Sequence, residues 1–141
     1  MPAQNLMILC TGEFSLGHIL SGYINFYSGK RINSTTVNTQ KNTIHPLAIQ
    51  VMKEDGIDIS AYKSVDRDSV NNKSYDLIIN LLEDKTEHND LTDPQNILFP
   101  VFKRPAIQAG YEQVLQEYRE LREQIKQYSI ELVGKHCKTP L

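Results

Sequence analysis

Apolar residues along this chain follow two patterns, one typical of strands and one typical of helices. Residues 6–9 and 75–82 are short runs dominated by apolar side chains, as expected for strands of a parallel sheet that is covered on both faces. Residues 16–27 and 108–132 instead repeat apolar side chains at helical spacing, which predicts two amphipathic helices. A further helix is predicted for residues 46–55.

Weaker patterns supply the remaining elements. Residues 31–37 and 96–99 are short segments with several β-branched or aromatic side chains, and we interpret them as two more strands. Residues 38–43, 62–72 and 83–93 are polar and are interpreted as loops, the second of them with the alternative of a short helix. Strand and helix patterns thus alternate along the chain, which predicts an α/β fold, a three-layer α/β/α sandwich with a four-stranded parallel sheet.

Turn-forming residues set the expected helix boundaries. Ser15 is a residue type that caps helices, and it precedes the first helical pattern directly. Gly29 follows that pattern and is expected to end the helix. His45 and Pro46 introduce the second helix, since proline is favoured at the first helical position, and Gly56 is expected to stop it.

The loop between the first strand and the first helix is the main candidate for chemistry. Cys10 ends the first strand pattern, at the edge of a parallel sheet where ligands bind. Backbone N–H groups of a turn and of a helix N-terminus converge on an anion, and the same field favours a thiolate. The anion-binding loop is therefore predicted to consist of Thr11, Gly12, Glu13, Phe14, Ser15, Leu16 and Gly17. The alternative is that Cys10 is a small buried core residue.

Composition and charge narrow the class of protein. With 141 residues and a net charge of −2, we predict one domain over residues 1–134 and a tail over residues 135–141. The absence of a long basic run argues against nucleic acid and acidic membranes as partners. The N-terminal apolar run is too short for export or membrane insertion, so a cytoplasmic location is expected. Two cysteines and four scattered histidines predict neither a metal site nor a cofactor.

Four segments resemble the low-molecular-weight protein tyrosine phosphatases and the related thioredoxin-coupled arsenate reductases. They are LMILCTG, HPLAIQVMKEDGIDIS, YDLIINLLED and FKRPA, and the resemblance extends over nearly the whole chain. It implies the phosphotyrosine phosphatase I-like fold, with Cys10 as the nucleophile that opens the phosphate loop. The family's loop pattern is a cysteine, five residues, an arginine, and then serine or threonine.

The loop departs from that pattern at functional positions. Leu16 stands where the resemblance implies the arginine that grips two phosphoryl oxygens, and Gly17 replaces the hydroxyl residue. Glu13 replaces an asparagine and adds negative charge. In FKRPA, Arg104 occupies the place of the aspartate that protonates the leaving group, and arginine is not an acid near neutral pH.

The cysteines that relay electrons in the arsenate reductase branch are also missing. Leu82 stands at the first of these positions, and residues 83–93 contain no cysteine. Cys137 lies in the tail, so a disulfide with Cys10 would require the tail to fold back over the loop.

Two functional hypotheses follow from these departures. The first is a catalytically degenerate family member that acts as a binding or regulatory module, with a possible protein partner and weak binding of phosphate or another oxyanion. The alternative is an active cysteine-dependent phosphatase or arsenate reductase-like enzyme, in which Cys10 is the nucleophile and Arg104 replaces the missing loop arginine. A related hypothesis pairs Glu13 with Arg104 across the pocket, in the place of a bound anion.

Overall fold

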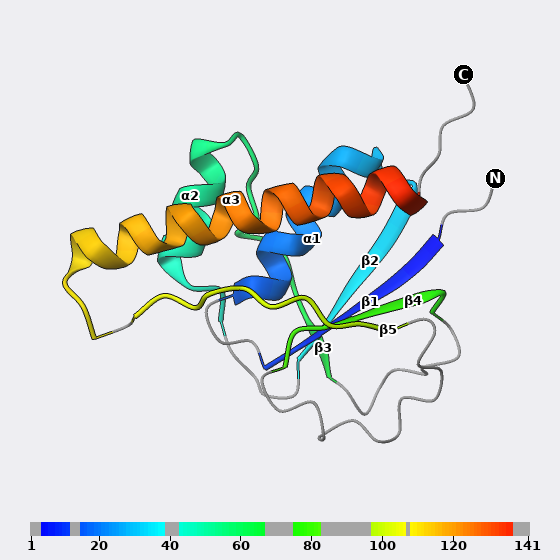
Figure 1. Ribbon diagram of the computed structural model, residues 1–141, viewed down its shortest axis with the longest axis horizontal. Helices are drawn as coiled ribbons and strands as arrows, with labels where there is room; N and C mark the ends of the chain where they lie inside the picture. The colour runs from blue at the N-terminus through cyan, green and yellow to red at the C-terminus, as the bar shows by residue number, and fades with distance from the viewer. Residues whose placement is uncertain are drawn as a thin grey trace.

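A computed structural model of the chain describes residues 4–11, 15–38, 43–66, 75–82, 97–106 and 108–136 (Figure 1). Its elements, in chain order, are β1 (Gln4–Cys10), α1 (Leu16–Ser28), β2 (Ile32–Asn38), α2 (Pro46–Glu54), β3 (Val65–Asp66), β4 (Leu77–Asn80), β5 (Ile97–Leu98) and α3 (Tyr111–His136).

The strands form one parallel sheet in the order β3-β2-β1-β4-β5. The predicted α/β class with a parallel sheet is therefore confirmed. The sheet has five strands where four were expected, because the short strand β3 forms within residues 62–72, which were interpreted as a loop or short helix. β3 is only two residues long and adds to the outer edge of β2, and a pairing made by so few backbone groups leaves little trace in the side-chain pattern.

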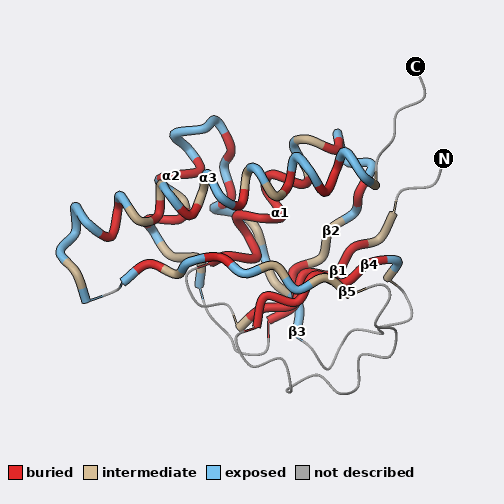
Figure 2. Tube along the Cα trace, viewed as in Figure 1, coloured by how far each residue is buried: buried red, intermediate tan, exposed pale blue. Residues whose placement is uncertain are grey.

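Side chains of β1 alternate between two buried clusters. Leu6, Ile8 and Cys10 belong to the larger cluster, which includes the buried faces of all three helices. Met7 and Leu9 belong to a smaller cluster on the other face of the sheet, and both are fully buried. Figure 2 shows this concentration of buried backbone at the centre of the sheet. Both faces of β1 are thus apolar and buried, as the continuous apolar run predicts.

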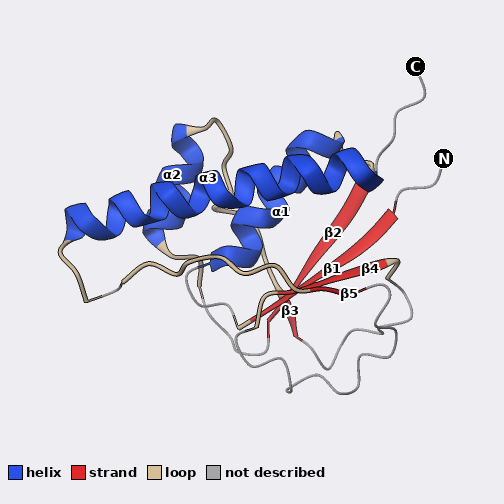
Figure 3. Ribbon diagram, in the orientation of Figure 1, coloured by secondary structure: helices blue, strands red, loops and turns tan. Residues whose placement is uncertain are grey.

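Helices α1, α2 and α3 lie on the same side of the sheet (Figure 3). The predicted stripe on α3 is confirmed, since its buried residues are Val114, Leu115, Tyr118, Leu121, Ile125, Ser129, Leu132 and Val133. A third layer, on the opposite side, would fall outside the residues that the structure describes. None of the helices in the described ranges is both long and apolar enough to span a membrane.

The starts of α1 and α2 differ in their capping. Ser15 occupies the N-cap position of α1, but its side chain makes no capping hydrogen bond and its backbone is left-handed, with φ of 61°. Its Oγ instead accepts a hydrogen bond from the backbone N–H of His45, at 2.7 Å. The predicted cap by Ser15 is therefore wrong, because the left-handed backbone directs that hydroxyl toward α2. α2 begins as expected at Pro46, and there the His45 Nδ1 accepts the N–H of Leu47 at 3.1 Å.

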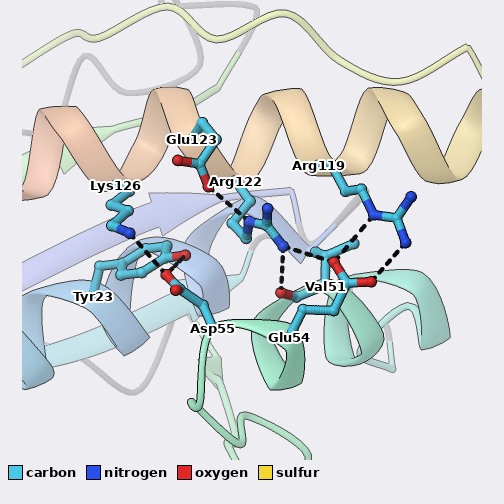
Figure 4. A network of polar contacts seen from close by, with 8 residues as sticks. All are labelled: Tyr23, Val51, Glu54, Asp55, Arg119, Arg122, Glu123 and Lys126. Atoms are coloured by element: carbon cyan, nitrogen blue, oxygen red, sulfur yellow. Dashed lines mark hydrogen bonds and ion pairs between the residues drawn. The ribbon is translucent and has the colours of Figure 1, made fainter.

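A polar network fastens the end of α2 to α3 (Figure 4). Arg119 donates two hydrogen bonds to the carboxylate of Glu54, and Arg122 donates to the same carboxylate at 2.8 Å and to the carbonyl oxygen of Val51 at 2.9 Å. The two arginines are one turn apart on α3 and hold one acidic side chain between them. This arrangement joins the C-terminal end of α2 to α3.

Asp55 extends the same network to α1. The hydroxyl of Tyr23 donates to Asp55 Oδ2 at 2.8 Å, and the ammonium of Lys126 lies 3.2 Å from the same oxygen. Tyr23 is fully buried, so its ring packs in the core while its hydroxyl reaches the rim. All three helices therefore meet at one carboxylate, as the close view in Figure 4 shows.

Candidate functional site

Cys10 is the last residue of β1, and its thiol lies inside the protein beside β2. The residue is 4% exposed. Its Sγ donates to Asn38 Oδ1 at 2.9 Å, and the carbonyl oxygen of Val37 is 3.8 Å away. In both of these contacts the thiol is the donor and an oxygen atom of β2 is the acceptor.

Asn38 was interpreted as the first residue of a loop, but it is the last residue of β2. In the parallel register it pairs with Cys10. Its side chain is buried, and its Nδ2 donates to the hydroxyl of Ser64 at 2.8 Å. The sequence analysis missed both Asn38 and Ser64 as site residues. The strands β1 and β2 end together at the carboxyl edge of the sheet, so their last residues are paired. Had the sequence been aligned in this parallel register, Asn38 would have been predicted to lie beside Cys10.

The start of α1 packs tightly against the thiol. A Cβ atom built on Gly17 would lie 2.8 Å from Cys10 Sγ and 2.9 Å from Thr36 Cγ2, closer than real side-chain atoms approach. Gly17 therefore lets the helix come near enough to fix the position of Sγ. Thr11 is half-buried. The predicted loop residues Gly12, Glu13 and Phe14 lie outside the described residues, and so does any pairing between Glu13 and Arg104.

Leu16 and Arg104 line the same cavity. Its volume is about 280 Å³, and its lining residues are Leu16, Leu81, Leu82, Pro100, Val101, Phe102 and Arg104. Leu16 is the first residue of α1, and the others follow β4 and β5 at the carboxyl edge of the sheet. The residue at the expected arginine position and the residue at the expected aspartate position thus share one site.

Arg104 brings positive charge to an otherwise apolar wall. Its Nη2 donates to the carbonyl oxygen of Leu81 at 2.8 Å, which anchors the guanidinium beside the segment that follows β4. Leu82, at the position implied for a relay cysteine, is 1% exposed and lines the same cavity. A cavity with apolar walls and one guanidinium suits an anion, because a weakly screened positive charge attracts it.

His18 is not among the residues that line this cavity. His18 is buried on α1, packs edge-on against Tyr62, and has no hydrogen-bond partner at Nδ1 within the described residues. Burial lowers its pKa, so it is neutral at physiological pH. Asp84 and Cys137 lie outside the described ranges. In the part of the chain that the structure describes, no three histidine, cysteine or acidic side chains gather where a metal ion could bind.

Comparison with known proteins shows which sequences and structures the chain resembles. No family model matches the chain. It is 31% identical to an arsenate reductase of Bacillus subtilis over 96 residues, 67% of this chain and 68% of the relative. It is also 24% identical to the glutaredoxin arsenate reductase of Synechocystis over 132 residues, which are 94% of this chain and 98% of the relative.

Solved structures agree on the fold. A structure described as an arsenate reductase in the phosphate binding state matches with a TM-score of 0.79 at 23% identity, over 94% of this chain and 98% of that one. A low-molecular-weight protein tyrosine phosphatase from T. tengcongensis matches with a TM-score of 0.73 at 20% identity, over 94% and 99% of the two chains. The resemblance seen in the sequence is confirmed: the chain belongs to the arsenate reductase family and has the fold that this family shares with the low-molecular-weight protein tyrosine phosphatases.

Proposed function

We propose that this protein is a cysteine-dependent enzyme of the arsenate reductase type, in which Cys10 attacks a tetrahedral oxyanion and Arg104 replaces the missing loop arginine. The observation that carries the proposal is the shared cavity: Leu16 and Arg104 line the same space. A guanidinium that enters the cavity from another segment of the chain can grip the oxyanion, since its final position, not the loop that carries it, determines binding.

The chemistry begins when the Cys10 thiolate forms a bond to arsenic and one arsenate oxygen leaves as water after taking up a proton. A second thiol then attacks the Cys10 sulfur and forms a mixed disulfide, and its own proton goes to solvent. The electron pair of the broken sulfur–arsenic bond stays on arsenic, which leaves as arsenite. Arg104 stabilises the negative charge of the oxyanion throughout.

The second thiol comes from outside the described site. Leu82 fills the position implied for a relay cysteine, and the apolar residues around it offer no thiol. A dithiol protein is the chemical class of reductant required, and a glutaredoxin is named in the Synechocystis relative. A third thiol resolves the mixed disulfide and returns Cys10 to its reduced form.

Arsenate suits this site better than a phosphate monoester. An ester leaves as an alkoxide or phenoxide that needs a positioned acid, and Arg104 stands where the resemblance implies that acid. Arsenate loses water, whose oxygen is protonated readily by solvent. Losing general acid catalysis costs roughly 10² to 10⁴ in rate, so we expect ester hydrolysis to be much slower than arsenate reduction.

The test is arsenite formation from arsenate in the presence of a glutaredoxin, glutathione and a glutathione-recycling system. Cys10→Ser is expected to abolish turnover, and Arg104→Leu to lower kcat/KM by about 10² to 10³. Arg31→Leu is the matched control, because Arg31 lies at the opposite end of β2 from this edge and its Nε donates to the carbonyl oxygen of Ser28. Turnover that survives Arg104→Leu unchanged contradicts the assignment of Arg104.

A second candidate is the binding or regulatory module. The observation that favours it is the burial of Leu16, which is 3% exposed and fills the arginine position with a core side chain. On this hypothesis phosphate binds weakly and Arg104→Leu weakens that binding, but arsenite is never formed with any thiol. Titration calorimetry with phosphate, run beside the turnover assay, distinguishes the two candidates.

A further inference from the structure

Cys10, Asn38 and Ser64 form a chain of three side chains that can carry hydrogen bonds in either direction. In the structure Cys10 Sγ donates to Asn38 Oδ1, and Asn38 Nδ2 donates to Ser64 Oγ. A hydroxyl both donates and accepts, and a sulfur donates as a thiol but accepts as a thiolate. The amide between them has a donor on one side and an acceptor on the other.

We propose that Asn38 is a positioning residue whose side-chain amide turns over when Cys10 ionises, so that Nδ2 donates to the thiolate and Oδ1 accepts from the Ser64 hydroxyl. With the amide in either orientation, the side chains of all three residues are hydrogen-bonded to one another. This proposal concerns Cys10, the nucleophile on which the proposed function rests. It describes only how Cys10 ionises, so it can be tested without measuring enzymatic turnover.

Packing explains why the amide must move and the thiol cannot. Gly17 brings the backbone of α1 close against Sγ, and the cysteine is the last residue of a strand paired on both edges. If the amide stayed fixed, a buried thiolate would face the Asn38 and Val37 oxygens, and the repulsion between these oxygens and the negative sulfur disfavours the charged form. A donated N–H favours the charged form instead.

Other titratable groups lie on the elements that pack around these three side chains. His18 follows Gly17 on α1, Lys63 adjoins Ser64, and Asp66 of β3 pairs with Asn38 in the sheet register. β2 and β4 contribute no titratable side chain. Arg104 follows β5. Their fields act at longer range and are screened by salt, whereas a direct hydrogen bond is not.

The experiment measures the pH at which Cys10 is half ionised, in a Cys137→Ser background. The readouts are the ultraviolet absorbance of the thiolate, corrected with Cys10→Ser, and the rate of iodoacetamide alkylation, each at low and high salt. Asn38→Leu keeps the volume but has neither donor nor acceptor. We expect the midpoint to rise by at least about one pH unit, which means about tenfold less thiolate at a given pH below it.

The direction of this shift decides the proposal. If Asn38 were only a fixed acceptor that holds the thiol protonated, its replacement would remove a repulsive oxygen, and the midpoint would fall. A fall, or no change, therefore overturns the inference. Asn33→Leu is the matched control, because it makes the same change on an exposed position of the same strand, and its midpoint should equal that of the background protein.

Two further measurements cover the case in which Asn38→Leu fails to fold. Asn38→Ala is expected to raise the midpoint by a smaller amount, because water can enter the space. In the unsubstituted protein, the side-chain amide signals of Asn38 in nitrogen-resolved NMR should shift with the same midpoint as the thiolate absorbance. Amide signals that do not follow the ionisation of Cys10 contradict the proposal, whatever the outcome of the arsenite assay.

Discussion

Arg119 grips the carboxylate of Glu54 with two nitrogen atoms: its Nε lies 3.1 Å from Oε1 and its Nη2 lies 2.7 Å from Oε2. These bonds, together with those from Arg122, hold the pKa of Glu54 at about 2, below its ordinary value of 4.5. The ionised carboxylate is therefore the form that the folded protein prefers, and α2 and α3 are joined most firmly when it carries its charge.

Acid is expected to weaken this joint. Because the folded-state pKa of Glu54 is depressed, its stabilising contribution is complete above about pH 4.5 and is lost as the pH falls toward 2. Glu54→Gln should therefore lower the unfolding free energy near neutral pH, and the difference from the unsubstituted protein should vanish near pH 2. Denaturant unfolding at both pH values checks this. An equal loss at both would show that packing, not charge, dominates.

Tyr23→Phe tests the link between α1 and Asp55. The change removes a hydroxyl that donates to Asp55 at 2.8 Å but keeps the buried ring. We expect a loss of about 1 to 2 kcal/mol in unfolding free energy, since the acceptor is charged. Tyr27→Phe is the control: its ring stacks on Tyr23, and Tyr27 is not among the residues of the network in Figure 4. Equal effects of the two changes would contradict the prediction.

Gly17→Ala should be the least tolerated glycine substitution among those in described helices. The added Cβ would meet Cys10 Sγ at 2.8 Å, so α1 must move away from β1. We expect a loss of about 1 to 3 kcal/mol and faster alkylation of Cys10 as the packing opens. Gly134→Ala, where a Cβ meets nothing within 4 Å, should instead stabilise α3 by about 0.5 to 1 kcal/mol. Thermal melts of both variants check the contrast.

Leu16→Arg is expected to strengthen oxyanion binding at a cost in stability. The new guanidinium would reach into the cavity that already contains Arg104, and a second charged donor should improve phosphate affinity by about tenfold. The melting temperature should fall, because Leu16 is almost fully buried. Leu16→Met keeps the apolar volume and is the control for both measurements. Phosphate affinity equal to that control would show that position 16 does not face the anion.

The sequence pattern predicted the parts of the fold that rest on buried apolar surface. The continuous apolar run of β1 is most stable when both faces of the strand are buried. The apolar stripe of α3 is most stable when that one face of the helix is buried. β3 was missed because an edge strand of two exposed residues is held by backbone hydrogen bonds, which any side chains permit.

The candidate site was predicted less completely, for a different reason. Cys10, Leu16 and Arg104 could be located because each occupies a recognisable position in a motif. Asn38 and Ser64 belong to no motif, and their role depends on two strands ending at the same level of the sheet. Ser15 was predicted as a cap from its residue type, but its left-handed backbone turns its hydroxyl to His45. Residue type alone does not fix such local geometry.

The position of β1 in the sheet has a consequence for synthesis. Along the chain β1 precedes the other strands of its sheet, yet it lies in the middle of the sheet between β2 and β4. Its partner on one edge is residues 32–38, but its partner on the other is residues 77–80. α3, which packs on the helical side of the sheet, follows all of these strands. Nascent chains that end before residue 111 are therefore expected to expose apolar core surface and to need protection by chaperones until α3 is released.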